Sequence, residues 1–499
     1  MSIRMVALAA ASLVCGPSVA QAQLTISNKP TKNVSCSGGT CSATAARANL
    51  NVSDLVSMLS SADVSVASGS QAQNIVLAQP LSWTSAHKLA LNSSHNITIN
   101  APLIVEGTSS LTLAYGNDGV SKIAFSGKGR IAFWDLHSAY VIEGIAFTLV
   151  DSIAALAQKA QIKGDYALAN DYDAAKDGVY GSAPIAHDFS SFFFGNGNTI
   201  SNLTIRAKKS NATLGLFEFV DGSITNLHLT KVAVKGKSAS IVGGLAGYMY
   251  GYVDAVTVSG KISAGPDSIV GGLVGAVDNG GFAYVLNSST SGQVSGTGTD
   301  SSGASLVGGL AGRLNAVIDF SFSSATVTGG IGWRAGGLVG ENPAGSVSMS
   351  FATGTVKVAD NGFAGGLIGD SGFFGGNNTY ATGFVIGGVG STVGGLIGHN
   401  QGPIQNSYSS GPVASGSGNA VGGFIGNDSG PTDLTNTYWD ITTSGQSHGV
   451  GNDTSYPGIT GLTTEEFQAG LPSGFDSAVW AEDANINGGL PYLLAVPPK

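Results

Sequence analysis

Charged side chains are scarce in this chain, and their scarcity narrows the functions it can have. Asp, Glu, Lys and Arg make up 11% of the 499 residues, less than half the share usual in soluble domains. Nucleic acids and anionic lipids are bound by clustered Lys and Arg. The nearest approach to such a cluster is Arg206, Lys208 and Lys209, which we interpret as a solvated loop. We therefore expect no nucleic-acid partner.

Long apolar runs are also lacking. The amino terminus has one apolar run, and it is short. Arg4 supplies positive charge, Met5–Val14 is apolar, and Ala20-Gln21-Ala22 resembles a signal-peptidase site. The apolar run is too short to be a stable membrane anchor. We predict that residues 1–22 are a signal peptide and that the mature chain has no integral membrane segment. The exported chain would be extracellular or at the cell surface, with the periplasm as an alternative.

Cysteine is nearly absent. Of three cysteines, signal-peptide cleavage would leave Cys36 and Cys41, separated by Ser-Gly-Gly-Thr. In an oxidising compartment this pair could close a small disulfide loop. The alternative is half of a four-cysteine zinc site, whose other ligands are lacking.

Catalytic clusters are lacking as well. Residues 243–430 hold nine acids and four bases, and we expect them not to recur at the period of the repeat described below. There is no nucleophile elbow with partner residues and no phosphate loop leading into a helix. The sequence predicts no catalytic residue, no cofactor site and no metal site.

The densest acidic stretch contains Asp165, Asp171, Asp173 and Asp177. Asp171 and Asp173 could offer oxygen ligands to calcium, although the spacing of a known calcium loop is missing. The other interpretation is a polar loop.

Glycine, in contrast, is abundant, with 75 residues, and much of it lies in a repeat. A Gly-Gly-Leu-x-Gly unit occurs seven times, with Phe424 in place of Leu in the last copy. Start-to-start spacings are 28, 37, 28, 29, 29 and 28 residues. The copies are Gly243–Gly247, Gly271–Gly275, Gly308–Gly312, Gly336–Gly340, Gly365–Gly369, Gly394–Gly398 and Gly422–Gly426.

Two further columns keep the same period. The first is aromatic at five of seven places: Thr257, Ser289, Phe322, Phe351, Tyr380, Tyr408 and Tyr438. The second is aliphatic: Ile262, Val294, Val327, Val356, Val385 and Val413. A period near 28 fits one coil of two or three short strands, stacked on its neighbours at about 4.8 Å. We expect the paired glycines to supply positive φ at corners and to allow close approach of the backbone.

The predicted fold is all-β: a right-handed parallel β-helix (β-solenoid) with short helical insertions and a C-terminal cap. Residues 23–195 form an irregular β-helix with helices at Val52–Leu59 and at Ile153–Ala160, the latter capped by Asp151. Residues 196–434 form the repeat solenoid, and the nine extra residues of its second rung loop out partly around 298–304. Residues 435–499 form the cap, with a helix opened by the capping box of Thr463. Trp480 and Pro491–Leu494 would close over the last rung.

The Gly-Gly-Leu-x-Gly repeat resembles the GLUG motif of bacterial surface and secreted proteins. The stretch 77–147, with Leu81-Ser82-Trp83 and His95-Asn96-Ile97-Thr98-Ile99, is similar to the β-helical shafts of filamentous-haemagglutinin-type adhesins. These resemblances imply a surface or secreted role, often in adhesion. Some GLUG-bearing proteins are zinc peptidases that cleave immunoglobulin A. That chemistry needs a His followed by Glu, and none of the seven histidines has one.

Three functions stay open from the sequence. The first is an adhesion or glycan-binding rod, in which turn aromatics such as Phe373 and Phe374 contact host or bacterial surface glycans or proteins. The second is a polysaccharide lyase or hydrolase, which needs two carboxylates from adjacent rungs within about 10 Å of each other. The third is a structural spacer with no ligand. Rung-to-rung variation, at 298–304, at Phe373-Phe374 and before residue 195, is where we expect function.

Overall fold

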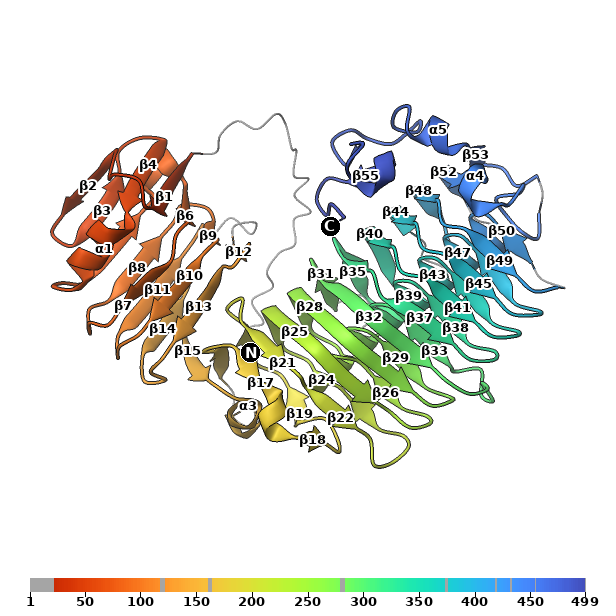
Figure 1. The fold of residues 1–499 in the computed structure, drawn as a ribbon, viewed down its shortest axis with the longest axis horizontal. Coiled ribbons are helices and arrows are strands. Elements are labelled where there is room, and N and C mark those ends of the chain that lie inside the picture. Colours follow the sequence, from red (N-terminus) through yellow and green to blue (C-terminus); the bar gives the residue numbers. More distant parts are fainter. Residues whose placement is uncertain are drawn as a thin grey trace. The chain divides into compact units, whose positions relative to one another are not determined.

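The computed structural model describes residues 22–116, 122–159, 164–278, 283–372, 376–417, 420–430, 433–453 and 455–498. Strands account for 51% of the chain and helices for 7%, which confirms the all-β class and the β-solenoid (Figure 1). The chain divides into two compact units. Unit 1 comprises Met1–Tyr172, Ser191–Thr199 and Thr225–Leu227, and unit 2 comprises Asp173–Ser190, Ile200–Ile224 and His228–Lys499.

Unit 1 is a coil with three parallel ladders. The first is β4 (Arg47–Asn51), β1 (Gln23–Ser27), β6 (Asn74–Leu77), β9 (Ile97–Ile99) and β12 (Ile123–Phe125). The second is β7 (Leu81–Trp83), β10 (Pro102–Val105) and β13 (Arg130–Phe133). The third is β3 (Thr40–Ala43), β5 (Val64–Ala67), β8 (Leu89–Asn92), β11 (Ser110–Ala114) and β14 (Ala139–Ile142). Alternate residues of these strands are fully buried, so one apolar core runs through the rungs.

The helices of unit 1 lie close to where the sequence predicts them. Helix α1 (Val52–Leu59) has the expected bounds, and Asn51 caps it by accepting from the main-chain N–H groups of Ser53 and Asp54. Helix α3 (Ile153–Lys159) also forms, but its cap was predicted wrongly. Ser152 Oγ, not Asp151, accepts from the Ala155 N–H at 3.2 Å. A shorter helix, α2 (Gly69–Ala72), was not predicted.

Unit 2 carries the repeat on three faces. An eight-stranded sheet contains β23 (Thr213–Leu214), β26 (Ile241–Val242), β29 (Ile269–Gly271), β33 (Leu306–Gly308), β38 (Arg334–Gly336), β42 (Phe363–Gly365), β46 (Thr392–Gly394) and β50 (Val421–Gly422). A nine-stranded sheet contains β19 (Ile185–Phe189), β24 (Phe217–Val220), β27 (Ala246–Met249), β30 (Val274–Asp278), β34 (Ala311–Asn315), β39 (Val339–Asn342), β43 (Ile368–Ser371), β47 (Ile397–Asn400) and β51 (Ile425–Asp428).

The third face of unit 2 is built from longer or paired strands. They include β22 (Thr204–Arg206), β25 (Ser223–Lys235), β28 (Tyr252–Ala264), β31 (Tyr284–Leu286), β32 (Ser289–Gly296), β35 (Val317–Asp319), β36 (Phe322–Ser323), β37 (Thr326–Gly329), β40 (Ser346–Ala352), β41 (Val356–Val358), β44 (Gly376–Ala381), β45 (Val385–Gly387), β48 (Ile404–Ser409), β49 (Val413–Ser415), β52 (Leu434–Asp440) and β53 (Ile459–Leu462). The predicted aliphatic column runs in register along this face from Ile262 to Val413.

Each Gly-Gly-Leu-x-Gly unit forms the corner between the eight-stranded and nine-stranded sheets. Its Leu, or Phe424, is at most 1% exposed, as the sequence predicts. The expected close approach of the backbone is also confirmed, because a Cβ on Gly366 would lie 2.0 Å from the Gly395 carbonyl oxygen of the next rung. The expected positive φ is wrong. No motif glycine has it, and left-handed residues recur instead within strands of the third face, at Asn378, Asn406 and Asn436.

The predicted aromatic column forms a stack on the third face. Phe322, Phe351, Tyr380 and Tyr408 lie with ring centroids 4.6–5.2 Å apart and planes within 7° of parallel. Tyr438 continues the register.

The C-terminal cap is present, but Trp480 and Pro491–Leu494 do not close over the last rung as expected. It folds back along the side of the aromatic stack, which Figure 1 shows as the segment around α5 (Thr464–Phe467) and β55 (Tyr492–Leu493). Trp480 contacts Tyr380 and Tyr408, which precede the last repeat, and its Nε1 donates to Asn378 Oδ1 at 3.0 Å. The capping box of Thr463 is confirmed. Helix α4 (Ile441–Ser444) and strand β53 instead follow the last repeat strand, β52.

The predicted signal peptide lies outside the described residues except for Ala22. Within the part of the chain that is described, none of the helices has the length and apolarity needed to span a membrane.

Candidate functional site

The residue that follows each Gly-Gly-Leu-x-Gly unit forms a column on the nine-stranded sheet. Its members are in register from rung to rung, and no amino acid occurs twice among them. They are Tyr248, Ala276, Arg313, Glu341, Asp370, His399 and Asn427. We call this set the post-motif column. Because the motif itself is buried, these positions are where the sequence of the repeat is free to vary.

The charged half of the post-motif column is a continuous network of ion pairs. Arg313 Nε lies 3.5 Å from Glu341 Oε2, and His399 Nδ1 lies 2.8 Å from Asp370 Oδ1. Arg334, from β38 of the adjacent sheet, joins the two acids, with its Nε 3.8 Å from Glu341 Oε1 and 2.8 Å from Asp370 Oδ2. All four carboxylate oxygens therefore face a cation or a histidine.

The network is half-buried, and this shifts the pKa of Glu341. Burial raises the pKa of the Glu341 carboxyl and the charge of Asp370 raises it further, while Arg334 and Arg313 oppose the rise. His399 Nε2 also lies 2.8 Å from Ser429 Oγ, and the Arg334 guanidinium carbon lies 5.7 Å from the Phe363 ring centroid. The expectation that acids do not recur at the repeat period is wrong here, since Glu341 and Asp370 share one register position.

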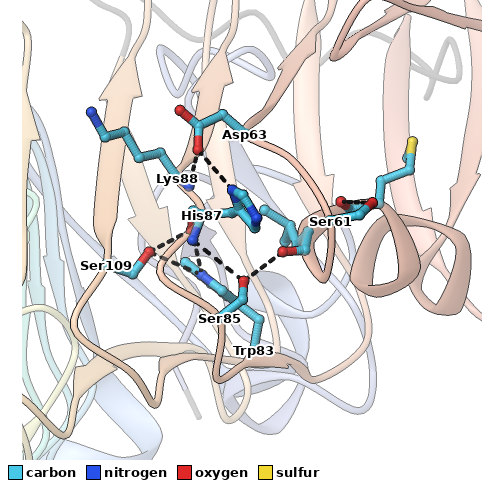
Figure 2. A network of polar contacts seen from close by, with 9 residues as sticks. Ser61, Asp63, Trp83, Ser85, His87, Lys88 and Ser109 are labelled. Atoms are coloured by element: carbon cyan, nitrogen blue, oxygen red, sulfur yellow. Dashed lines mark hydrogen bonds and ion pairs between the residues drawn. The ribbon is translucent and has the colours of Figure 1, made fainter.

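Unit 1 contains an Asp-His-Ser grouping that the sequence analysis did not single out (Figure 2). Asp63 Oδ1 lies 3.4 Å from His87 Nδ1 and accepts from the Lys88 N–H, which holds the pKa of Asp63 below its usual value. The hydroxyl that a catalytic triad would need is engaged elsewhere, because Ser85 Oγ donates to the Leu59 carbonyl oxygen at 2.5 Å. Ser109 Oγ likewise donates to the His87 carbonyl oxygen. These contacts tie turns of the coil together and do not activate a nucleophile.

A hollow of about 560 Å³ lies in unit 2 where the third face turns toward the eight-stranded sheet. Lys235 and Lys237 line it, and both are exposed. The rest of its lining consists of small residues, without an acid or an aromatic ring: Ser210, Gly236, Ser238, Ser263, Ala264, Gly265, Ser295 and Thr297. We call it the basic hollow.

Three further basic residues lie on the rung next to that of Lys235. Arg206 is the register partner of Lys235 on the neighbouring strand, and Lys237 Nζ donates to the Lys208 carbonyl oxygen at 2.8 Å. Lys209 follows Lys208 in the chain. Of this predicted solvated loop, only Lys208 and Lys209 lie outside a strand, because Arg206 ends β22. None of the ion pairs among the described residues involves a lysine.

The carboxylates of Asp171 and Asp173, which the sequence offered as calcium ligands, already form an ion pair or hydrogen bonds with other residues. In unit 1, Asp171 pairs with Arg130 and accepts from the Thr199 N–H. In unit 2, Asp173 accepts from Asn202 Nδ2 and from the Ala175 N–H, which lowers its pKa. Across the described ranges, no three His, Cys, Asp or Glu side chains gather closely enough to hold a metal ion.

The remaining sequence candidates are structural where they are described. Cys36 and Cys41 form a disulfide across the hairpin of β2 (Val34–Ser37) and β3. The 298–304 insertion is a loop, as predicted, in which Ser301 and Ser302 donate to the Asp267 carboxylate. The Phe373-Phe374 turn lies outside the described residues.

Sequence reasoning missed the basic hollow because its lining comes from successive rungs, from Ser210 to Thr297. Arg206 and Lys235 are 29 residues apart, close to one repeat period. The post-motif column was missed for the same reason, although aligning the seven motifs and reading one position further would have found it. The repeat period was the usable signal in both cases.

Comparisons with known proteins add little to this geometry. No family model matches the chain, and the resemblance to GLUG and haemagglutinin-type proteins stays a prediction. Halomucin of Haloquadratum walsbyi (strain DSM 16790 / HBSQ001) is 29% identical over 270 residues, which are 52% of this chain and 3% of Halomucin. A proposed immunoglobulin A1 protease from Bacteroides ovatus superposes on 70% of this chain and 93% of its own, with 17% identity and a TM-score of 0.40. Another structure, an IgA1 protease, covers 57% of this chain and 20% of its own, with 20% identity and a TM-score of 0.41.

Proposed function

We propose that this chain is an exported β-solenoid protein that binds acidic glycans at the basic hollow. The observation that carries the proposal is that Lys235 and Lys237 both line the hollow, with Arg206 in register beside Lys235, on a chain with a net charge of −9. Cations that cluster without paired acids raise the local concentration of anions and favour binding of polyanions.

The chemistry of the lining favours a glycan over a nucleic acid. Serine and threonine hydroxyls around the two lysines can donate to and accept from sugar hydroxyls. Single-stranded nucleic acids are usually held by aromatic side chains on which bases stack, and the hollow contains none. A carboxylated or sulfated polysaccharide therefore fits the hollow best.

Export is supported by two features at the amino-terminal end. Residues 1–22 have the pattern of a signal peptide. Cys36 and Cys41 are joined in a disulfide, a bond that persists in oxidising compartments outside the cytosol. An exported β-solenoid protein with a polyanion site suits adhesion to host or bacterial surfaces.

Retention on immobilised acidic polysaccharides tests this function. We expect the purified chain to bind carboxylated or sulfated glycans at low salt and the double variant Lys235→Ser/Lys237→Ser to bind them more weakly. Lys357→Ser is the matched control, because Lys357 is exposed on the same face three rungs beyond Ser263. Loss of binding in the control, or unchanged binding in the double variant, would contradict the proposal. Tighter binding to single-stranded DNA than to every acidic glycan would identify the ligand of the hollow as a nucleic acid and not a glycan.

A second candidate, hydrolysis or lysis of a polysaccharide, rests on the pair of Glu341 and Asp370. The two acids lie on adjacent rungs, both within 4 Å of Arg334 Nε, and the pKa of Glu341 is raised as in a general acid. The ion pairs that occupy all four oxygens argue against it, because a general acid must be free to reach its substrate.

Release of reducing or unsaturated ends from a polysaccharide panel tests this second candidate. We expect no release by the native chain. Release that disappears in both Glu341→Gln and Asp370→Asn would establish the enzyme and overturn the purely binding role.

A further inference from the structure

The corner that joins the nine-stranded sheet to the third face is rich in tyrosine. Its sequence is Tyr248-Met249-Tyr250-Gly251-Tyr252, in which β27 ends at Met249 and β28 begins at Tyr252. Met249 is fully buried, whereas Tyr250 on the turn is 38% exposed. The three tyrosines thus mark the outer side of the corner.

Neighbouring rungs extend this aromatic surface. Phe219 lies one rung away in register with Tyr248, with ring centroids 6.2 Å apart. Tyr248 and Tyr250 stack at 4.9 Å with an interplanar angle of 28°. Around the corner, Tyr252 faces Tyr284 at 6.5 Å. We call Phe219, Tyr248, Tyr250, Tyr252 and Tyr284 the tyrosine corner.

Tyr248 is fixed in place by a carboxylate. The Tyr248 hydroxyl donates to Asp278 Oδ2 at 3.1 Å. Asp278 lies on β30 two residues after Ala276, the register partner of Tyr248. Burial, with the nearby charge of Asp278, raises the pKa of Tyr248 to about 12, so the phenol stays protonated. A small residue at Ala276 leaves the side of the Tyr248 ring without a bulky neighbour in the column. The aromatic surface is therefore held rigidly before any ligand arrives.

The charges around the corner are mostly negative. Glu218 precedes Phe219 on β24, and Asp188 is the register partner of Phe219 on β19. Asp221 is close enough to Asp188 for its charge to raise the pKa of that carboxyl, to which burial contributes more. An acidic surface repels acidic glycans, and its carboxylates accept hydrogen bonds from sugar hydroxyls.

We propose that the tyrosine corner is a second binding site, specific for a neutral glycan. The apolar C–H face of a pyranose ring would pack on Tyr250 and its stacked partner Tyr248, while hydroxyls at the ring edge donate to the carboxylates. Rigid aromatic side chains bury a large area at a small entropic cost, which suits a weakly hydrophobic ligand. The charge of the corner separates this ligand from the acidic glycan proposed for the basic hollow.

Retention on neutral β-glucan, xylan and mannan in about 1 M salt tests the proposal, because salt at that level screens exposed charges beyond about 3 Å. We expect the native chain to bind at least one of these glycans and Tyr250→Ala to weaken binding at least about tenfold. Phe384→Ala is the matched control, since Phe384 is also 38% exposed in the repeat region. It should bind as the native chain does.

The same experiment separates this proposal from the function proposed above. Lys235→Ser/Lys237→Ser should weaken binding of the acidic glycan at low salt and leave binding of the neutral glycan at high salt unchanged. Tyr250→Ala should weaken binding of the neutral glycan and leave binding of the acidic glycan unchanged. Far-ultraviolet circular dichroism verifies that Tyr250→Ala is folded. Failure of the native chain to bind any neutral glycan, or unchanged binding by folded Tyr250→Ala, would overturn the tyrosine corner as a glycan site. So would capture of a protein ligand that neutral oligosaccharides do not displace.

Discussion

At the scale of single residues, the motif glycines are required by main chains that pass close to them. A Cβ on Gly366 would lie 2.0 Å from the Gly395 carbonyl oxygen and 2.8 Å from the Ala381 Cβ, in a packed core that cannot give way. We predict that Gly366→Ala lowers the free energy of unfolding by about 3 kcal/mol or more, measured by denaturant titration.

Gly303→Ala is the control for Gly366→Ala. Gly303 has a φ of +74° and no atom within 4 Å of its added Cβ, so the substitution strains the backbone without a collision. Gly303→Ala should lower the free energy of unfolding by about 1 kcal/mol. Equal costs at the two positions would show that close approach is not what the motif glycine serves.

Asp319 is a single residue whose charge opposes folding. Burial raises the pKa of Asp319 to about 6, although its carboxylate accepts from Ser348 Oγ and from the Phe320 N–H. The folded state therefore binds a proton more tightly than the unfolded chain, whose Asp titrates near 3.8. The free energy of unfolding should fall as the pH rises from about 4 to about 6 and stay lowered above that range.

Asp319→Asn tests this assignment, because the amide oxygen keeps both hydrogen bonds and carries no charge. Asp319 is partly exposed, so we expect the variant to gain only about 2 kcal/mol at neutral pH and almost nothing near pH 4. Thermal unfolding at the two pH values measures the difference. A gain of equal size at both would rule out the charge as its cause.

The burial and contacts of a residue were predictable from the sequence where the residue belongs to a repeating column, and not predictable elsewhere. Leu338 and Val356 belong to columns, so their burial followed from the period. The ion-pair partners of Glu341 did not follow from the period, because Arg334 contacts Glu341 from another sheet. Positive φ was assigned to the motif glycines by analogy with turns, whereas the corner instead needs their lack of a side chain.

At the scale of elements, the C-terminal segment is a side cover for the aromatic stack. Tyr408 donates its hydroxyl to the Pro491 carbonyl oxygen and accepts from Asn487 Nδ2. Trp480, which is fully buried, stacks on Phe475 at 4.5 Å. The sequence shows the helix signal at Thr463 but not the docking face, since any apolar edge of a solenoid could receive a cap.

Trp480→Ala should release this cover locally. Truncating a fully buried aromatic side chain costs about 3–5 kcal/mol, and the loss here falls on the packing between the cover and Tyr380 and Tyr408. We expect amide hydrogen exchange of residues 463–496 to accelerate by about a hundredfold or more.

Trp134→Ala serves as the control for the cover. Trp134 is 64% exposed in unit 1, so its truncation should change stability by no more than about 0.5 kcal/mol and leave the exchange of residues 463–496 unaltered. Unchanged exchange in Trp480→Ala would mean that the cover does not depend on the aromatic stack.

At the scale of the whole molecule, the few charged side chains are clustered by sign on the surface and not evenly distributed. Two of the 22 basic residues line the basic hollow and three more lie on the adjoining rung, while acids surround the tyrosine corner. A parallel solenoid makes this possible, because each rung places variable residues at fixed positions along a rigid surface. The overall class followed from the repeat, but surface sites built from residues one period apart required the three-dimensional register.

The salt dependence of acidic-glycan binding tests the central claim most directly. Binding of the native chain and of Lys235→Ser/Lys237→Ser would be titrated between about 50 and about 200 mM salt. The account predicts a steep linear fall of log K with log salt for the native chain, and a slope shallower by about two in the double variant, one for each cation removed. A native chain whose binding is absent or independent of salt, or a double variant with the native slope, would contradict it.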